Sequence, residues 1–238
     1  MLPPPGGTHR MRSEMPARYR DRREAGRRLA DKLLEYANRP DVIVLALPRG
    51  GVPVAFEVAM ALHAPMDVFI VRKLGLPDHE ELAIGAIATG GVRILDERAI
   101  RAFGVSEAEL AEVTAVETRE LMRRERLYRG SQPPLDVRGR TVILVDDGLA
   151  TGSTMLAAVT ALRRENAARV VVGVPIAPPE TCDAFREVVD DIVCVMTPEP
   201  FYAVGRWYED FSQTTDDEVR ELLERAAHEA GLASSSRV

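Results

Sequence analysis

Short runs of consecutive apolar residues alternate along the chain with segments whose apolar residues recur every three or four positions. Uninterrupted apolar runs are typical of strands covered on both faces of a parallel sheet, and the longer spacing is typical of helices. The predicted strands are 42–47, 68–71, 141–145, 170–174 and 192–195. The predicted crossover helices are 54–62, 154–164 and 179–188. This alternation predicts an α/β fold with a doubly wound parallel sheet.

The stretch between the second and third predicted strands departs from the alternation. Two apolar runs flank Gly90-Gly91, which predicts a hairpin outside the parallel sheet. Ser106, with Glu109 three residues later, is a capping box that predicts the start of a long charged helix. We therefore expect residues 78–130, approximately, to form an insert that acts as a lid.

Both ends of the chain differ from its middle. Residues 1–17 combine Pro, Gly and Arg without an apolar period, which predicts a disordered tail. Asp21 is the expected N-cap of a first amphipathic helix, and Thr215 opens a last helix whose first turn is acidic. We expect residues 18–238 to form a single domain with a small hood at about 197–214.

Composition narrows the classes of function. The formal net charge of -6 argues against bulk attraction to nucleic acid or to anionic membranes. No secretory leader or membrane-length apolar run is visible, and Cys182 and Cys194 are the only cysteines, so we expect a protein of the reducing cytoplasm. The four histidines share no ligand spacing with either cysteine, and no intrinsic metal site is predicted.

The segment Val142–Thr154 carries the strongest chemical signal. An apolar strand runs into Asp146-Asp147, and a loop of small residues then leads to a helix. Backbone N–H groups, side-chain hydroxyls and the helix N-terminus of this loop can surround a phosphate. The loop residues are Ala150, Thr151, Gly152, Ser153 and Thr154. Adjacent carboxylates would repel that phosphate, so we expect them to accept hydrogen bonds from the hydroxyls of a ribose ring.

Other phosphate-binding motifs fit poorly. No Gly-Lys-Ser or Gly-Lys-Thr occurs, which excludes a P-loop, and no Gly-x-Gly-x-x-Gly follows a strand. A haloacid-dehalogenase-like pair needs its two acids one residue apart, whereas Asp146 and Asp147 are adjacent and point in different directions.

The same residues resemble a known family. An apolar strand, Asp-Asp and Ala-Thr-Gly-x-Thr are similar to the diphosphate-sugar signature of type I phosphoribosyltransferases. The resemblance implies that Asp146 and Asp147 hold the ribose 2- and 3-hydroxyls of 5-phosphoribosyl 1-diphosphate, while residues 150–154 hold its 5-phosphate. An ordinary strand, loop and helix with capping polar residues is the alternative. After residue 17 the chain resembles, in particular, a bacterial group known only as predicted phosphoribosyltransferases.

Two further loops support the resemblance. Arg49, Gly50 and Gly51 follow the first strand, where the family turns backbone amides toward pyrophosphate; a plain turn with a surface arginine is the alternative. Arg72-Lys73 opens a segment similar to Arg-Lys-x-Gly-x-Leu-Pro of adenine-type members, where the basic pair contacts diphosphate. One expected cation is missing near its end, and a surface charge is the alternative. The resemblance also implies Mg²⁺, carried by the substrate.

The acceptor is expected under the hood. Phe201, Trp207 and Tyr208 lie in a segment that loosely resembles the purine-salvage hood, where aromatic faces stack a planar base. Packing of these rings into a small satellite core is the alternative. The resemblance implies transfer of the 5-phosphoribosyl group to a nitrogenous base, with a purine as one candidate, and release of pyrophosphate. No catalytic acid or base is identified.

Two other functions stay open at this point. One is a non-catalytic sensor or regulator that binds the sugar phosphate on the same fold. The other is RNA or protein regulation through the arginine-rich part of the long helix, around 119–129. Glutamates interleave with these arginines, which favours a solvated or dimer-facing helix, and we expect a homodimer that binds neither nucleic acid nor membrane.

Overall fold

The computed structural model describes residues 18–76 and 79–235, with the backbone alone for residues 79–81 and 231–235. The predicted disordered tail, residues 1–17, lies outside the described residues. None of the described helices is long and apolar enough to cross a membrane.

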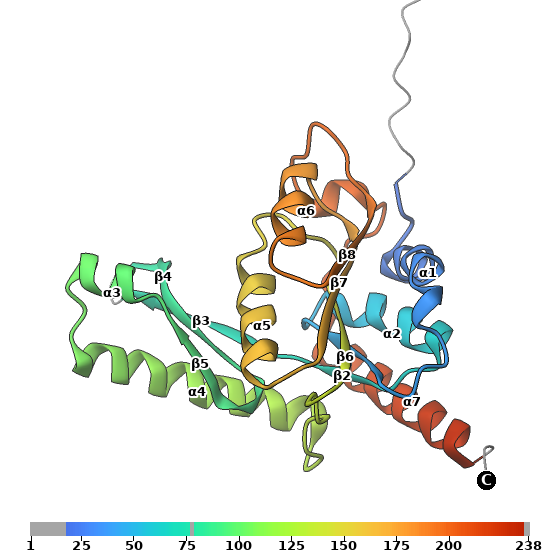
Figure 1. The fold of residues 1–238 in the computed structure, drawn as a ribbon, viewed down its shortest axis with the longest axis horizontal. Coiled ribbons are helices and arrows are strands. Elements are labelled where there is room, and N and C mark those ends of the chain that lie inside the picture. The colour runs from blue at the N-terminus through green and yellow to red at the C-terminus, as the bar shows by residue number, and fades with distance from the viewer. Residues whose placement is uncertain (1–17, 77–78, 236–238) are drawn as a thin grey trace, which may run out of the picture.

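A parallel sheet of five strands forms the centre of the molecule (Figure 1), in the order β2-β1-β6-β7-β8. Its strands are β1 (Val42–Ala46), β2 (Met66–Val68), β6 (Thr141–Val145), β7 (Arg169–Ile176) and β8 (Asp191–Met196). All four pairings between neighbouring strands are parallel. Every residue of β1 and β6 is buried, as their uninterrupted apolar runs predict for strands covered on both faces.

Helices cover both faces of this sheet. The helices α1 (Arg22–Lys32) and α2 (Gly51–Leu62) pack on the side chains of Val42, Val44 and Ala46. On the other face α5 (Ser153–Arg164) and α6 (Pro179–Arg186) pack with Ile43 and Leu45. Successive residues of β1 therefore point into two separate hydrophobic cores, one on each face of the sheet. The predicted doubly wound fold is confirmed.

Residues 71–129 form an arm that extends away from the five-stranded sheet, on the left of Figure 1. A second, antiparallel sheet in the arm contains β3 (Val71–Leu76), β4 (His79–Ala88) and β5 (Val92–Leu95). The sheet is followed by α3 (Glu97–Phe103) and the long helix α4 (Glu107–Arg129), which opens with the predicted Ser106–Glu109 capping box. The hairpin outside the parallel sheet is confirmed, whereas α3 had no counterpart among the predicted elements.

The predicted strand 68–71 is wrong, because the chain changes sheets inside it. Phe69 donates its backbone N–H to the Ala46 carbonyl in the large sheet, while Ile70 donates to the Thr89 hydroxyl in the arm. Both side chains are buried at the junction, so the apolar run continues although the strand does not. Consequently Arg72 and Lys73 belong to the arm sheet and not to the end of a parallel strand.

A buried ion pair joins the two ends of the arm. Arg129, the last residue of α4, donates from Nε to both carboxylate oxygens of Asp67 in β2, each at 2.9 Å. The Leu135 N–H donates to the same carboxylate at 3.2 Å. The Arg129 and Asp67 side chains are 6% and 10% exposed, so the pair is shielded from water and fixes the base of the arm.

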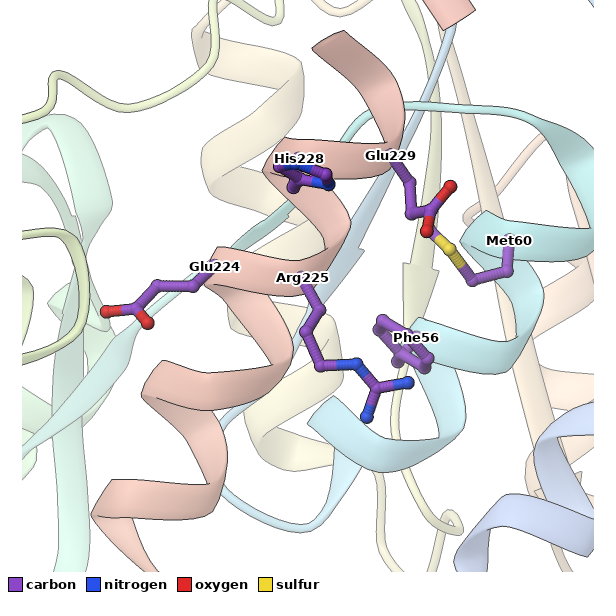
Figure 2. Close-up of a pocket in the computed structure, with 6 residues that line it drawn as sticks. All are labelled: Phe56, Met60, Glu224, Arg225, His228 and Glu229. Carbon is purple, nitrogen blue, oxygen red and sulfur yellow. The ribbon is translucent and has the colours of Figure 1, made fainter. Parts of the chain in front are cut away.

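The last helix of the chain packs beside α2. The last helix α7 (Asp216–Ser235) lies along α2, and a cavity of about 450 Å³ between them is lined by Phe56, Met60 and Arg225 among others (Figure 2). Three short 3₁₀ turns complete the described structure: η1 (Leu34–Tyr36), η2 (Thr89–Gly91) and η3 (Val204–Trp207).

A disulfide joins Cys182 in α6 to Cys194 in β8. The sequence-based expectation of reduced cysteines is therefore wrong for this structure, and the cytoplasmic location stays a prediction.

Candidate functional site

The candidate site lies where the direction of winding changes. Strands β1 and β6 are neighbours with Ala46 opposite Val145, but the chain continues from β1 to β2 on one side and from β6 to β7 on the other. The loops after β1 and β6 thus leave the sheet side by side at its carboxyl edge. Ligands of doubly wound proteins bind in the crevice at this point.

Two glycines bring the first loop against the acids of the second. A Cβ atom on Gly50 would overlap Asp147 Oδ2, and one on Gly51 would lie 2.8 Å from the Val145 carbonyl and 2.9 Å from Asp146 Cα. At Gly51 the neighbouring atoms belong to the backbone and leave no room for a side chain, whereas at Gly50 an added Cβ would require the Asp147 carboxylate to move. The helix α2 starts at Gly51, three residues before the predicted start, so its first N–H groups also lie beside the acids. The peptide bond between Pro48 and Arg49 is cis. We call residues 49–51 and 146–154 the diacid site.

The two aspartates have different surroundings. The Asp147 backbone N–H donates to Asp146 Oδ1 at 2.8 Å, whereas Asp147 Oδ2 accepts from Arg22 Nε at 2.8 Å. Burial raises the pKa of Asp146 well above its ordinary value, and the charge of Asp147 raises it further. Burial also raises the pKa of Asp147, but Arg22 opposes that rise. Arg22 therefore favours the ionised form of Asp147. Asp146 has no arginine bonded to its carboxylate, so its protonated form is favoured more strongly.

The loop after the acids ends in the N-terminus of α5. Gly152 is the N-cap and has φ +75, a left-handed conformation that favours glycine. A Cβ at this position would lie 2.5 Å from the ring of Phe185, so α6 packs directly on the loop. Thr181 of α6 adds a hydrogen bond of 2.9 Å to the Ala150 carbonyl. Ala150, Thr151 and Ser153 are exposed and Thr154 is half-buried, which leaves the hydroxyls and the first helical N–H groups accessible to an anion.

The hood packs onto the same loops. A Cβ on Gly148 would overlap the side chain of Val204 in η3, and the Tyr208 hydroxyl donates to the Asp147 carbonyl at 2.5 Å. Trp207 and Tyr208 are 9% and 2% exposed and share a small core with Tyr19 and Ile176, with Phe201 packed against it. Their rings are covered by protein, which favours the packing alternative over base stacking for Trp207 and Tyr208. The exposed aromatic residues of this segment are Tyr202, at 69%, and Phe211, at 37%.

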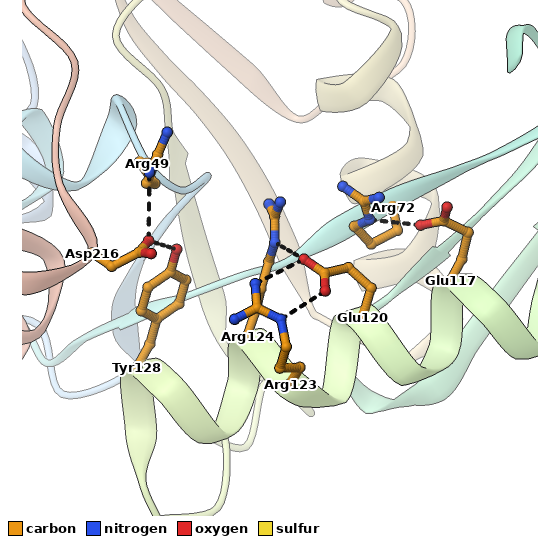
Figure 3. Close-up of polar contacts among 8 residues, drawn as sticks. All are labelled: Arg49, Arg72, Glu117, Glu120, Arg123, Arg124, Tyr128 and Asp216. Carbon is orange, nitrogen blue, oxygen red and sulfur yellow. Dashed lines mark hydrogen bonds and ion pairs between the residues drawn. The ribbon is translucent and has the colours of Figure 1, made fainter.

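Carboxylates hold the two arginines predicted to bind pyrophosphate (Figure 3). Arg49 lies 3.7 Å from Asp216 at the start of α7, and the Tyr128 hydroxyl of α4 donates to the same carboxylate at 2.7 Å. Burial and this hydrogen bond raise the pKa of Tyr128 to about 12. In the arm, Arg72 Nε donates to Glu117 at 2.7 Å. Both cations are thus compensated by acids from helices outside the parallel sheet.

A cavity links the arm to the phosphate loop. It measures about 660 Å³ and is lined by Arg72 and Lys73 of β3, by Val116 and Glu117 of α4, and by Thr154 of α5, among others. The structure therefore brings the basic pair and one end of the phosphate loop to one hollow. The cavity between α2 and α7 adjoins the C-terminal half of α2, while the diacid site adjoins its N-terminus, so the two are separate.

Several contacts of the site could not be found from the sequence motifs. Arg22, Val204 and Asp216 reach the site from the two ends of the chain, and Glu117 reaches it from the arm. A signal for Arg22 exists, because it directly follows the predicted N-cap Asp21, but that spacing does not indicate its partner. No group of three His, Cys, Asp or Glu side chains among the described residues could hold a metal ion.

Comparisons with known proteins agree on one family. The model of the Phosphoribosyl transferase domain matches residues 18–201. Two curated proteins of Mycobacterium tuberculosis, from strains CDC 1551 and H37Rv, each named "Putative phosphoribosyl transferase", are 45% identical over 208 residues. The match covers 87% of this chain and 47% of each mycobacterial protein, so the chain spans about half of their length.

One solved structure is similar over nearly its whole length. TT1426 from Thermus thermophilus is 41% identical in sequence and superposes with a TM-score of 0.77. The superposition covers 87% of this chain and 98% of that one. The part of this chain left uncovered is shorter than the arm, so the similarity extends beyond the parallel sheet into the arm.

Proposed function

The chain belongs to the phosphoribosyl transferase family, and from this premise we propose that it transfers the 5-phosphoribosyl group of 5-phosphoribosyl 1-diphosphate to a nitrogenous base. A ring nitrogen of the base forms the new bond to C1 of the ribose, the bond from C1 to the diphosphate oxygen breaks, and pyrophosphate leaves with the bonding electrons. The nitrogen loses its proton to solvent or to the departing pyrophosphate.

One observation carries this proposal. Gly50 and Gly51 lie so close to the acids that an added Cβ would overlap Asp147 Oδ2 or lie 2.9 Å from Asp146 Cα, and both acids directly precede the loop that ends in residues 150–154. A diol acceptor and a phosphate cradle would thus adjoin the loop after β1 at the switch point of the sheet. The spacing suits a ligand that carries a ribose diol between two phosphate groups.

The roles of the residues follow from their chemistry. Asp146 and Asp147 accept hydrogen bonds from the ribose hydroxyls, and the hydroxyls and amides of residues 150–154 bind the 5-phosphate. Arg49, Arg72 and Lys73 compensate the diphosphate. A Mg²⁺ ion that arrives with the substrate supplies further positive charge to the leaving diphosphate. Since positive charge develops on the ribose as diphosphate leaves, nearby carboxylates stabilise it and the arm, closed as a lid, excludes water.

Pyrophosphate release tests the proposal. The protein is incubated with 5-phosphoribosyl 1-diphosphate, MgCl₂ and each member of a panel of purine and pyrimidine bases, and pyrophosphate is assayed. We expect release with at least one base and none when Asp147 is replaced by Asn. Release at the same rate without any base would indicate hydrolysis and contradict a transferase.

A non-catalytic sugar-phosphate sensor is the second candidate. The acids that already hold Arg49 and Arg72 favour it, because a cation engaged in an ion pair is less available to a leaving diphosphate. Calorimetry with 5-phosphoribosyl 1-diphosphate and with nucleoside monophosphates separates the two functions. Saturable binding without turnover of any base supports the sensor, and no binding of either ligand contradicts both functions.

A further inference from the structure

Arg22 connects three parts of the molecule through a single guanidinium group. Its Nε donates to Asp147 Oδ2 at 2.8 Å, and its NH1 donates to the Ser212 carbonyl near the end of the hood at 2.7 Å. The guanidinium carbon lies 4.0 Å from the centre of the Phe211 ring, in the geometry of a cation–π contact. Arg22 is itself the first residue of α1.

The arginines nearest to Arg22 in the sequence do not share this environment. The Arg22 side chain is 11% exposed, whereas those of Arg20 and Arg23 are 68% and 39% exposed. Arg20 pairs with Glu24 of α1, and Arg23 lies 3.8 Å from Glu57 of α2. Arg23 thus provides a matched control for Arg22, with the same charge on the next residue and no contact with the diacid site.

The contact fixes the direction of the carboxylate. Because Oδ2 of Asp147 is bound to Arg22 and crowded by the backbone of Gly50, the carboxylate cannot rotate freely about its last bond. No hydrogen bond to Oδ1 of Asp147 is formed among the described residues. A ribose hydroxyl would therefore meet an acceptor that is already oriented, and less entropy is lost on binding.

Other groups near Asp147 cannot replace Arg22. Asp146 is an acid, and the Tyr208 hydroxyl donates to the backbone carbonyl of Asp147 and not to its carboxylate. A lysine could supply a charge at this position, but it has no planar fork to bond the carboxylate and the Ser212 carbonyl in fixed directions.

On the basis of the proposed function, we propose that Arg22 is a positioning residue that orients Asp147 toward the ribose diol and fixes the end of the hood beside it. It acts through Asp147 and contacts neither phosphate of the substrate. The loss of Arg22 should consequently weaken ligands that carry the ribose diol and spare ligands that carry phosphate alone.

Two ligands distinguish these effects. Ribose 5-phosphate carries the diol and the 5-phosphate, and inorganic phosphate carries the anion alone; both are titrated by calorimetry into wild type, Arg22→Gln, Arg22→Lys and Arg23→Gln. We expect Arg22→Gln to weaken ribose 5-phosphate about tenfold, the value of one charge-assisted hydrogen bond, and to leave phosphate within about twofold. Arg22→Lys should recover part of the loss, and Arg23→Gln should match wild type.

Thermal unfolding of each variant accompanies the titrations. If Arg22→Gln does not fold, Phe211→Leu replaces it, since this change removes the ring that supports the guanidinium and keeps its charge. A smaller loss of the same kind, for ribose 5-phosphate and not for phosphate, is then expected.

The outcomes separate the inference from the proposed function. If wild type binds 5-phosphoribosyl 1-diphosphate but the Arg22 variants bind ribose 5-phosphate as wild type does, the inference alone is overturned. An equal loss for ribose 5-phosphate and phosphate also overturns it, because it indicates general damage to the site. If wild type binds none of these ligands, the proposed function fails and the inference fails with it.

Discussion

The diacid site and the arm present their charges in opposite ways. In the diacid site, two acids directly after the buried strand β6 lie against Gly50 and Gly51 of the loop after β1, with a single arginine from α1 beside them. In the arm, Arg72 and Glu117 lie on an antiparallel strand and a long helix, and their side chains are 29% and 20% exposed. Geometry in the first region is set by close approaches of backbone to backbone and of backbone to carboxylate, whereas in the second it is set by longer side chains that can rearrange.

This difference predicts where substitutions should affect stability and ligand binding most. A close-packed backbone cannot adjust to an added methyl group, while exposed ion pairs contribute little and re-form readily. Changes in the diacid site should therefore have large effects on both stability and binding. Changes in the arm should have moderate effects on binding alone.

The largest effect is expected for Gly50→Ala. The added Cβ would occupy the position of Asp147 Oδ2, so the carboxylate must turn away from both Arg22 and the ligand. We expect the affinity for 5-phosphoribosyl 1-diphosphate to fall about 100-fold or more, equivalent to about 2.7 kcal/mol. Isothermal titration calorimetry measures this change in affinity. An affinity within about threefold of wild type would show that the diacid site is less rigid than its contacts indicate.

Asp146→Asn should separate stability from binding. Because burial raises the pKa of Asp146 in the folded state, the folded protein binds this proton more tightly than the unfolded chain. Stability from this group is fully present below the unfolded pKa of about 3.9 and is lost as pH rises through the raised pKa. At neutral pH the Asn variant should therefore unfold at a higher temperature, by about 2–4 °C for each kcal/mol gained.

The same variant should bind ribose ligands about 10- to 100-fold more weakly, because the diol loses a charged acceptor. Asp147→Asn is the contrasting variant: it removes the charge that compensates the largely buried Arg22, so its melting temperature at neutral pH should lie below that of Asp146→Asn. Scanning calorimetry at several pH values checks both. A lower melting temperature for Asp146→Asn at neutral pH would contradict the argument from burial.

Gly152→Ala tests the packing of α6 on the phosphate loop, with Gly139→Ala as its matched control. Both glycines have positive φ, +75 and +68, so alanine strains both backbones alike. Only Gly152 has a ring 2.5 Å from the position of its Cβ, and a Cβ on Gly139 would meet nothing within 4 Å. We expect Gly152→Ala to lose about 1–3 kcal/mol more in the free energy of unfolding than Gly139→Ala. Equal losses in denaturant titrations would mean that Phe185 moves aside without cost.

The smallest effects are expected in the arm. Arg72→Gln should weaken pyrophosphate binding about tenfold, and Glu117→Gln should strengthen it slightly, because Arg72 is then freed for the ligand. Arg123 serves as the control on the same helix, because it pairs with Glu120 and its side chain is 60% exposed. Calorimetry with pyrophosphate should show Arg123→Gln within about twofold of wild type. A loss as large as that of Arg72→Gln would extend the site along α4.

The parallel sheet was predictable because its strands are buried on both faces, and burial of this kind leaves an uninterrupted apolar run. Strand β6 and the diacid motif that follows it could be located to the residue for the same reason. The run ending at Val71 was misleading, since Phe69 and Ile70 are as buried at a junction of two sheets as they would be within one strand. An apolar run in the sequence indicates that its side chains are buried, but it does not indicate which sheet or helix buries them.

The candidate site was predictable only in its local parts. The acids and the phosphate loop are contiguous in sequence, whereas Arg22 is separated from Asp147 by 125 residues. For Trp207 and Tyr208 the sequence leaves base stacking and core packing both open, because aromatic residues suit either, and only the fold shows that they share a core with Tyr19 and Ile176. Contacts between residues so far apart in the sequence depend on how whole helices pack, and the spacing of residues along the chain does not indicate them.

The Arg129–Asp67 ion pair at the base of the arm makes the arm an inserted segment that can be exchanged as a unit. Arg129 and Asp67 are separated by 62 residues, yet their bond brings the entry and exit of the inserted segment to one point beside β2. Since the cost of closing a loop grows only slowly with its length, a shorter or longer insert could replace this one while the same pair seals it. Evolution or a protein engineer could thus exchange the arm without altering the register of the large sheet, and so change what the hollow beside Thr154 accepts.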